Sequence, residues 1–369
     1  MSSRPLFIGS EIYRHSSFGR NHPLAIPRVS TTIDLCRALG WLDEASYVDS
    51  PRANPEQLAR FHDPAYIATL MEVERTQAAS PELRERYNLG KLENPIYPAM
   101  FRRPATACGA SIHAAELLRQ GGIVYSPAGG THHGRRDRAS GFCFFNDPVL
   151  GVLALLDQGV APVSYVDIDA HHGDGVQDAF ADEPRVRVIS VHEEGRWPFT
   201  GGSADRGGGN ARNIPVPAGF NDSEMAFVVD AALVPLAAET APQALVLQCG
   251  ADALQDDPLS RLGLSNRAIW YAVEQLKGIA PRLLVLGGGG YNPWSVARCW
   301  TGVWATLNGF NIPDGAIPPA GEAVLRTLAW SRSEGRNPPA HWFVTLADPP
   351  RPGPVRDAVR QAVAAALLP

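Results

Sequence analysis

The sequence predicts an α/β fold in which helices flank a central, mostly parallel β-sheet. Short apolar runs rich in Val, Ile and Leu alternate with amphipathic stretches, the pattern of successive βαβ units. Each of these runs ends in a cluster of Gly, His, Asp or other polar residues. Hydrophobic residues make up 45% of the 369 residues and charged residues 19%, so the chain can bury a large core.

Five strands are expected from the apolar runs. They are residues 122–125, 162–166, 186–191, 244–248 and 283–286. Because ligands bind beyond the carboxyl ends of the strands in open α/β sheets, we expect the five loops that follow these strands to converge on one site.

Helices are expected between the strands and near the carboxyl terminus. The segments between strands are residues 105–119, 147–156, 222–239 and 265–279. Asp147 is predicted to cap the second of these helices, with Pro148 at its first helical position. Residues 311–369 are expected to form a tail that is Pro-rich over 311–350, with little regular structure, and helical over 353–368. The whole chain is interpreted as one domain.

Charge and cysteine content narrow the class of protein. The chain has 33 Lys and Arg against 38 Asp and Glu, which argues against binding to nucleic acid or a membrane surface by bulk electrostatics. No apolar run approaches the roughly 20 residues that span a bilayer, and no secretory signal is recognised. The five cysteines are far apart, which suits a reducing compartment. A cytoplasmic protein is therefore expected.

A metal site is indicated by the segment that follows the second predicted strand. Asp167, Asp169 and His171 are spaced by two residues, so their side chains share one face while the chain stays extended. Two carboxylates and an imidazole are costly to bury without a cation, and they suit zinc or another first-row divalent ion. The alternative is a polar turn with an Asp helix cap.

Asp252 is the candidate for a further ligand, because it holds the equivalent place after another predicted strand. Taken alone, Asp252 is more readily interpreted as the N-cap of a following helix. An Asp-His-Asp set would leave one coordination position open for water, as in a catalytic zinc site.

Two adjacent histidines, His132 and His133, stand in a glycine loop and can divide the work of base and acid on a metal-activated water. Asp167 and Asp174 can each accept a ring N–H from one of them, which fixes the tautomer. The alternative is that one histidine is only a surface loop residue.

Tyr291 follows a run of four glycines, which allows a close approach of the backbone. Its phenol can donate a hydrogen bond to a developing oxyanion, although a lone Tyr more often packs at a strand end. The spacing of these glycines does not match that of a dinucleotide-binding loop.

Three aromatic residues, Phe142, Trp197 and Phe199, can shape a channel, and the alternative for each is ordinary packing.

These motifs occur together in a fixed order. They are GGTHHG (129–134), SGFCFFND (140–147), YVDIDAHHGDGVQDAF (165–180), LQCGADAL (247–254) and LGGGGYNPWSVARCW (286–300). The sequence resembles the histone deacetylase superfamily, in particular its class I and bacterial acetoin-utilisation branch. The resemblance runs from about His22 to Gly309.

The resemblance implies a three-layer arginase/deacetylase-like fold with a narrow tunnel to zinc. It implies zinc ligation by Asp169, His171 and Asp252, and an acid/base pair of His132 and His133 with Asp167 and Asp174 as partners. It also implies that Tyr291 polarises the amide carbonyl.

The tunnel residues implied are Gly141, Phe142 and Trp197, and Arg28 matches an arginine near an internal acetate pocket. The family also binds structural potassium, here near Asp167, Asp169, His171, Ser190 and Val191.

The sequence departs from the family pattern at several positions. Thr131 replaces an aromatic residue before the paired histidines, and the motif that usually ends Phe-Pro-Gly instead ends with Phe199. The acid at the rim of the tunnel is hard to place, and Asn94 falls near it. Long basic tails are absent, so the natural substrate need not be a histone.

The function expected is a zinc-dependent amidohydrolase that acts on an N-acyl amine, either a peptide with acetyl-lysine or a small molecule such as an acetylpolyamine. Iron(II) is an alternative metal, and a homo-oligomer is an open alternative to a monomer. Two other functions stay open. One is a dimanganese ureohydrolase of the same fold, and the other is a metal-retaining protein that binds acylated ligands without turnover.

Overall fold

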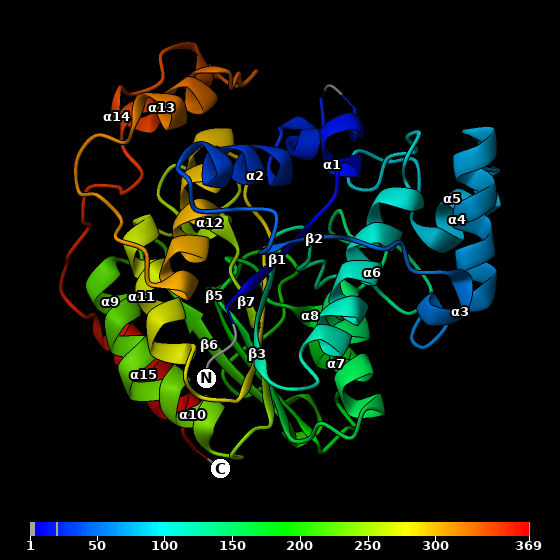
Figure 1. The fold of residues 1–369 in the computed structure, drawn as a ribbon. Helices are drawn as coiled ribbons and strands as arrows, with labels where there is room; N and C mark the ends of the chain where they lie inside the picture. The colour runs from blue at the N-terminus through cyan, green and yellow to red at the C-terminus, as the bar shows by residue number, and fades with distance from the viewer. Residues whose placement is uncertain (1–3, 20, 369) are drawn as a thin grey trace.

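The computed structural model describes residues 4–19 and 21–368, and its centre is one eight-stranded sheet (Figure 1). The strand order is β2-β1-β3-β8-β7-β4-β5-β6, and every neighbouring pair is parallel. The strands are β1 (Leu6–Gly9), β2 (Tyr47–Asp49), β3 (Gly122–Ser126), β4 (Val163–Asp167), β5 (Val186–Glu193), β6 (Ala211–Val216), β7 (Ala244–Gln248) and β8 (Arg282–Leu286). The predicted parallel sheet is confirmed.

Helices cover both faces of the sheet and give three layers (Figure 1). They are α1 (Ile12–His15), α2 (Val29–Ala38), α3 (Pro55–Leu58), α4 (Pro64–Thr76), α5 (Pro81–Tyr87), α6 (Arg102–Leu117), α7 (Asp147–Asp157), α8 (Asp174–Ala179), α9 (Asp222–Val228), α10 (Val234–Ala238), α11 (Asn266–Leu276), α12 (Pro293–Asn308), α13 (Pro319–Arg326), α14 (His341–Val344) and α15 (Asp357–Ala366). No helix among the described residues is long and apolar enough to cross a membrane.

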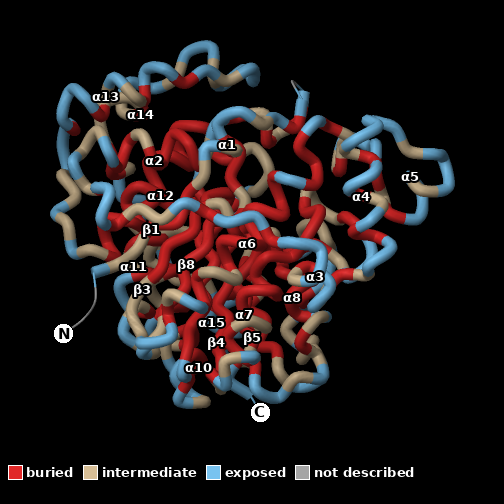
Figure 2. Tube along the Cα trace, turned by 45° about the vertical axis from the view of Figure 1, so that its right-hand side comes forward, coloured by how far each residue is buried: buried red, intermediate tan, exposed pale blue. Residues whose placement is uncertain are grey.

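Alternation along the strands divides the core between two layers of helices. In β3, Val124 belongs to a core cluster with α6 and α7, whereas Tyr125 belongs to the cluster with α2, α11 and α12. Successive side chains of a strand point to opposite faces, which explains this division. A third cluster joins α4, α5 and the loop before α7 to Tyr291. The inner strands and α12 are almost entirely buried, whereas the edge strand β2 has no buried residue and much of α5 and α13 is exposed (Figure 2).

The five predicted strands are present within about two residues, and β1, β2 and β6 were not predicted. β1 and β2 have four and three residues, too few to show a period. β6 has the sequence ARNIPV, whose polar residues interrupt the apolar run by which a strand would be recognised, although most of its residues are buried.

The longest missed element is α12. Every residue of this helix except Asn308 is buried, so it has no polar face to reveal a helical period. The predicted helix over 222–239 is confirmed as α9 and α10 joined by a π-helical turn over Val229–Leu233. The tail prediction is partly wrong, because α13 and α14 lie within 311–350, and its last helix is α15. The interpretation as one domain stays a prediction.

The predicted cap of α7 is also wrong. Asn146 is the N-cap, with its side chain accepting from the Val149 N–H at 3.1 Å. Asp147 is the first helical residue, and its carboxylate accepts from the backbone N–H groups of Gly130 and Thr131 at 3.0 and 2.8 Å. Asp147 therefore holds the loop that leads into the paired histidines.

Substitution of Gly302 in α12 tests how tightly this buried helix is packed. A Cβ atom at Gly302 would lie 2.1 Å from the Trp270 ring. Gly302→Ala is therefore expected to destabilise the fold by about 1–3 kcal/mol, although alanine normally favours a helix. The measurement is the free energy of unfolding in urea. Gly151→Ala in α7 is the control, because its nearest contact would be 3.2 Å away, and we expect little change. Equal effects of the two substitutions would contradict this account of the packing.

Candidate active site

Three buried side chains converge beyond the carboxyl ends of β4 and β7. Asp169 and His171 follow β4, and Asp252 follows β7. Their candidate ligand atoms all lie within 4.8 Å of one another. His171 Nδ1 lies 3.3 Å from Asp169 Oδ1 and 2.9 Å from Asp252 Oδ2. The structure thus brings together the three residues that the sequence marked as candidate ligands.

The glycine run after β8 closes around these carboxylates. The Gly289 N–H donates to Asp169 Oδ2 at 2.6 Å. A Cβ atom at Gly289 would lie 1.9 Å from Asp252 Oδ2, so any larger residue would collide with the carboxylate. The close backbone approach expected for the run is therefore directed at the two aspartates.

The charge of this group suits a bound cation. Burial lowers the pKa of His171, but the neighbouring Asp169 and Asp252 outweigh burial and raise it to about 10. Burial and Asp169 both raise the pKa of Asp252. Without a metal ion, the proton on His171 compensates the buried carboxylates. Two carboxylate oxygens and one imidazole nitrogen at this spacing fit a divalent ion such as zinc.

Two imidazole–carboxylate pairs stand beside the candidate ligands. His132 Nδ1 lies 2.7 Å from Asp167 Oδ2, and His133 Nδ1 lies 2.7 Å from Asp174 Oδ1. The two ring centroids are 3.9 Å apart. Both predicted pairings are present in the structure. The pairing of His133 leaves its Nε2 as the free ring nitrogen, whereas His132 Nε2 lies 3.8 Å from Asp169 Oδ1.

The two histidines differ in protonation. Burial lowers the pKa of His132, but Asp167 and Asp169 reverse this and raise it to about 9. Burial lowers the pKa of His133 to about 3, and the nearby His132 adds to this effect. Environments that push two pKa values apart allow one group to act as an acid and the other as a base.

The carboxylates of these pairs have further partners that sequence reasoning missed. The Tyr165 hydroxyl lies 2.9 Å from Asp167 Oδ2. Arg135 forms ion pairs with both Asp174 and Asp178. Burial raises the pKa of Asp174, but His133 and Arg135 together hold it below its usual value.

The site lies between an outer and an inner cavity. The outer cavity, of about 370 Å³, has lining residues that include Glu93, Trp197, Leu259 and Arg196. The inner cavity, of about 70 Å³, extends past the histidines toward Arg28. Both cavities are lined by His133, Gly141, Phe142, His171 and Tyr291. Tyr291 is thus placed where the two cavities meet.

The rim differs from expectation at two positions. Glu93, not Asn94, lines the outer cavity, and its Oε1 accepts the Gly141 N–H at 2.6 Å. Asn94 is buried and accepts the Phe142 N–H at 3.1 Å. Phe199, expected in the channel, lines neither cavity and is exposed to solvent.

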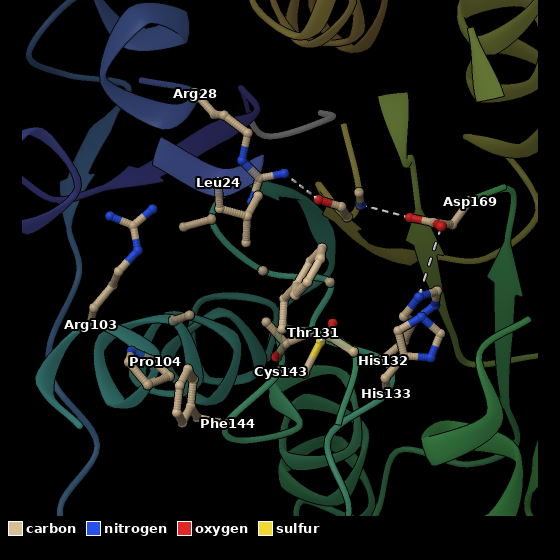
Figure 3. Close-up of a pocket in the computed structure, with 18 of the residues that line it drawn as sticks. Leu24, Arg28, Arg103, Pro104, Thr131, His132, His133, Cys143, Phe144 and Asp169 are labelled. Carbon is tan, nitrogen blue, oxygen red and sulfur yellow. Dashed lines mark hydrogen bonds and ion pairs between the residues drawn. The ribbon is translucent and has the colours of Figure 1, made fainter. Parts of the chain in front are cut away.

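Two arginines, the half-buried Arg28 and the buried Arg103, line the inner cavity (Figure 3). Arg28 donates to the Gly288 carbonyl at 2.7 Å and lies over the Trp300 ring. Arg103, which sequence reasoning missed, donates to Ser16 Oγ at 2.7 Å. Burial lowers the pKa of Arg28 to about 10 and also lowers that of Arg103. The two guanidinium groups suit a small anion.

Asp257 is a further buried residue that the sequence did not reveal. Its Oδ2 accepts the Tyr291 N–H at 2.7 Å, and its Oδ1 accepts the Leu259 N–H at 2.9 Å. Burial raises its pKa well above the usual value, and Asp252 adds to the rise. Asp257 thereby fixes the backbone on two sides of the outer cavity.

The predicted potassium site stays a prediction. Asp167 and Ser190 are paired across β4 and β5, and Val191 follows in β5. Ser190 Oγ lies 2.9 Å from His192 Nδ1.

Comparison with known proteins gives consistent matches. The family model described as the histone deacetylase domain matches residues 22–307. The acetoin utilization protein AcuC of Bacillus subtilis is 32% identical over 85% of this chain and 84% of its own length. Histone deacetylase 1 of Homo sapiens is 33% identical over 80% of this chain, which spans 63% of that longer protein.

Solved structures agree with the sequence comparisons. The crystal structure of an HDAC homolog from Aquifex aeolicus matches with a TM-score of 0.93 and 36% identity, over 99% of this chain and 100% of that chain. An HDAC homolog complexed with SAHA matches with the same values. The arginase/deacetylase-like α/β fold is confirmed.

Metal binding is expected to depend on pH. Since the metal-free pKa of His171 is about 10, one proton leaves for each ion bound, and affinity should rise about tenfold per pH unit between about pH 6 and pH 8. The measurement is competition for zinc with a chromophoric chelator at several pH values. His171→Asn should bind more weakly and lose this slope. A wild-type affinity independent of pH would contradict the proton assignment.

Loss of the Asp257 carboxylate should loosen the backbone at Tyr291 and Leu259. We expect Asp257→Ala to speed hydrogen exchange at these two amides, because each loses its buried acceptor. The control is Asp256→Ala, whose carboxylate has one donor among the described residues, the Trp342 indole at 3.2 Å. Unchanged exchange in Asp257→Ala, measured by mass spectrometry, would show that Asp257 does not hold this backbone.

Proposed function

The chain belongs to the histone deacetylase family, and we propose that it is a zinc-dependent amidohydrolase that removes an acyl group from an N-acylated amine. The observation that carries the proposal is the arrangement around one pair of cavities. The inner cavity is lined by Tyr291, by both paired histidines and by two of the candidate ligands, namely His132, His133, Asp169 and His171. The third candidate ligand, Asp252, lies behind them, with its ligand atom within 4.8 Å of those of the other two. Acetyl-lysine and acetylpolyamines are the proposed substrate classes.

Asp169, His171 and Asp252 would hold the metal ion. When bound, zinc would supply Lewis-acid polarisation of the substrate carbonyl and of the attacking water. Iron(II) is the alternative ion, since the same oxygen and nitrogen donors suit both.

The paired histidines would move the proton. His133, neutral at pH 7, takes a proton from water through Nε2 as the water oxygen attacks the amide carbon. His132, whose pKa Asp167 and Asp169 raise to about 9, would carry a positive charge and stabilise the negative charge that develops. The C–N bond then breaks, and the proton passes from a ring Nε2 to the departing nitrogen. The second proton of the water leaves the new carboxyl group, so that the products are a carboxylate and a protonated amine.

Tyr291 and the two arginines would act on the carbonyl and on the product. The Tyr291 phenol stays protonated, because burial and the nearby aspartates raise its pKa, so it can donate to the carbonyl oxygen. Arg28 and Arg103 would attract the carboxylate product into the inner cavity. The channel role of Gly141, Phe142 and Trp197 is proposed from their place around the outer cavity.

Other expectations stay proposals. Potassium would bind near Asp167, Ser190 and Val191. The proposed partners are N-acyl amines rather than nucleic acid or membrane, and a cytoplasmic location and a homo-oligomer remain predictions.

The two other functions are less well supported. Among the residues that the structure describes, Asp169, His171 and Asp252 form the single cluster with ligand geometry, whereas a ureohydrolase needs a second metal site. A binder without turnover would not need both imidazole–carboxylate pairs at hydrogen-bond distance.

His133→Ala tests the proposed chemistry. Removal of the base should lower turnover of a fluorogenic acetyl-lysine amide by about 100-fold while the metal stays bound. His113→Ala in α6 is the control, since this histidine pairs with Glu116 at the surface and should not alter turnover. The assay is run with and without chelator, and metal content is measured for each variant. Full activity of His133→Ala would remove His133 as the base. No wild-type hydrolysis of acetyl, longer acyl or polyamine amides would favour the binder.

A further inference from the structure

Two large apolar side chains stand exposed next to the outer cavity. Phe199 is 75% exposed and Leu92 is 66% exposed, the highest values for large hydrophobic residues in the described part of the chain. Leu92 directly precedes Glu93, and Phe199 is two residues after Trp197. Both Glu93 and Trp197 line the outer cavity, so the two exposed residues belong to the loops that supply its lining, although neither lines the cavity itself.

The backbone at Phe199 is unfavourable for any residue with a Cβ atom. Its φ is +64°, in the left-handed region that favours glycine. Its N–H donates to the Arg196 carbonyl at 2.8 Å, which holds the turn. Because the ring is exposed, packing does little to offset the strain. A strained and exposed phenyl group beside a cavity points to a role in binding.

The two side chains are joined by a continuous strip of rim. A Cβ atom at Gly141 would lie 2.5 Å from the Trp197 ring, so Trp197 packs directly on Gly141. The Gly141 N–H in turn donates to Glu93 Oε1 at 2.6 Å. The rim therefore runs from Phe199 through Trp197, Gly141 and Glu93 to Leu92.

The charge of the rim decides which amine fits it. Apart from histidines, the charged residues that line the outer cavity in the described structure are Glu93 and Arg196. Arg196 is already held by Glu193, with both nitrogen–oxygen distances at 2.9 Å. Glu93 is then the one carboxylate of this lining that faces the substrate. Because its Oε1 already accepts the Gly141 N–H, it suits one further peptide N–H better than a chain of several ammonium groups.

We propose that Phe199 and Leu92 make this enzyme selective for acyl-lysine in a peptide with a large apolar side chain next to the lysine. The apolar neighbour packs on these two side chains while the acyl-lysine enters the outer cavity. The inference rests on the proposed function, because it names the substrate class of the same site.

The test compares kcat/KM for acetyl-lysine tripeptides with Phe or Ser on either side of the lysine, and for N1-acetylspermine, which carries several ammonium groups. The wild type should prefer the better Phe peptide over its Ser counterpart by about tenfold, and N1-acetylspermine should be the poorest substrate. Phe199→Gly and Leu92→Ser should each bring the Phe/Ser ratio closer to one. Met71→Ser on α4 removes an exposed apolar side chain that lines neither cavity and should keep the ratio unchanged.

Thermal stability separates a binding role from a structural one. Phe199→Gly should raise the melting temperature, since glycine accepts the left-handed backbone, while peptide selectivity falls. A wild-type Phe/Ser ratio near one, better turnover of N1-acetylspermine than of the peptides, or a ratio unchanged in both rim variants would overturn the inference. Hydrolysis of none of these amides by the wild type would instead reject the proposed function.

Discussion

The structure depends on two carboxylates that are buried together at the ends of neighbouring strands. Asp169 and Asp252 lie within hydrogen-bond reach of the same His171 nitrogen and are almost fully enclosed. Buried negative charge is costly unless a cation or several donors compensate it. The surrounding backbone N–H groups, of which that of Gly289 is one, supply donors, and the remaining charge calls for a cation.

The fold brings the loops that follow the parallel strands together at one edge of the sheet, and side chains of a neighbouring helix hold these loops in place. Helix α12 supplies much of that support. The Trp300 indole donates to the Cys249 carbonyl at 2.9 Å, just before the loop of Asp252. The same ring lies against Arg28 and against the position of a Cβ atom at Gly287. One buried helix therefore connects the candidate ligand loop, the glycine run and the inner cavity.

Sequence patterns predicted those parts of the site that local spacing encodes. The two-residue period of Asp167, Asp169 and His171 and the ordered motifs were enough to nominate the central residues. The parts that were missed depend on tertiary contacts. The fully buried helix α12 shows no amphipathic period. Asp147 does not cap its own helix, because its carboxylate accepts a hydrogen bond from the loop at Gly130. Asp257 accepts the Tyr291 N–H, but nothing in the sequence distinguishes it from an ordinary acidic residue in a turn. How far these residues are buried, and which groups they contact, is determined by the folded chain and has no local signal in the sequence.

The central claim is that a single divalent ion occupies the space between the two carboxylates and the imidazole. Anomalous diffraction at the zinc edge from zinc-loaded crystals tests it most directly. The account predicts one peak per chain, about 2.0–2.2 Å from an oxygen of Asp169, an oxygen of Asp252 and Nδ1 of His171. A loaded crystal with no peak between these residues, or with two adjacent metal peaks, would contradict it.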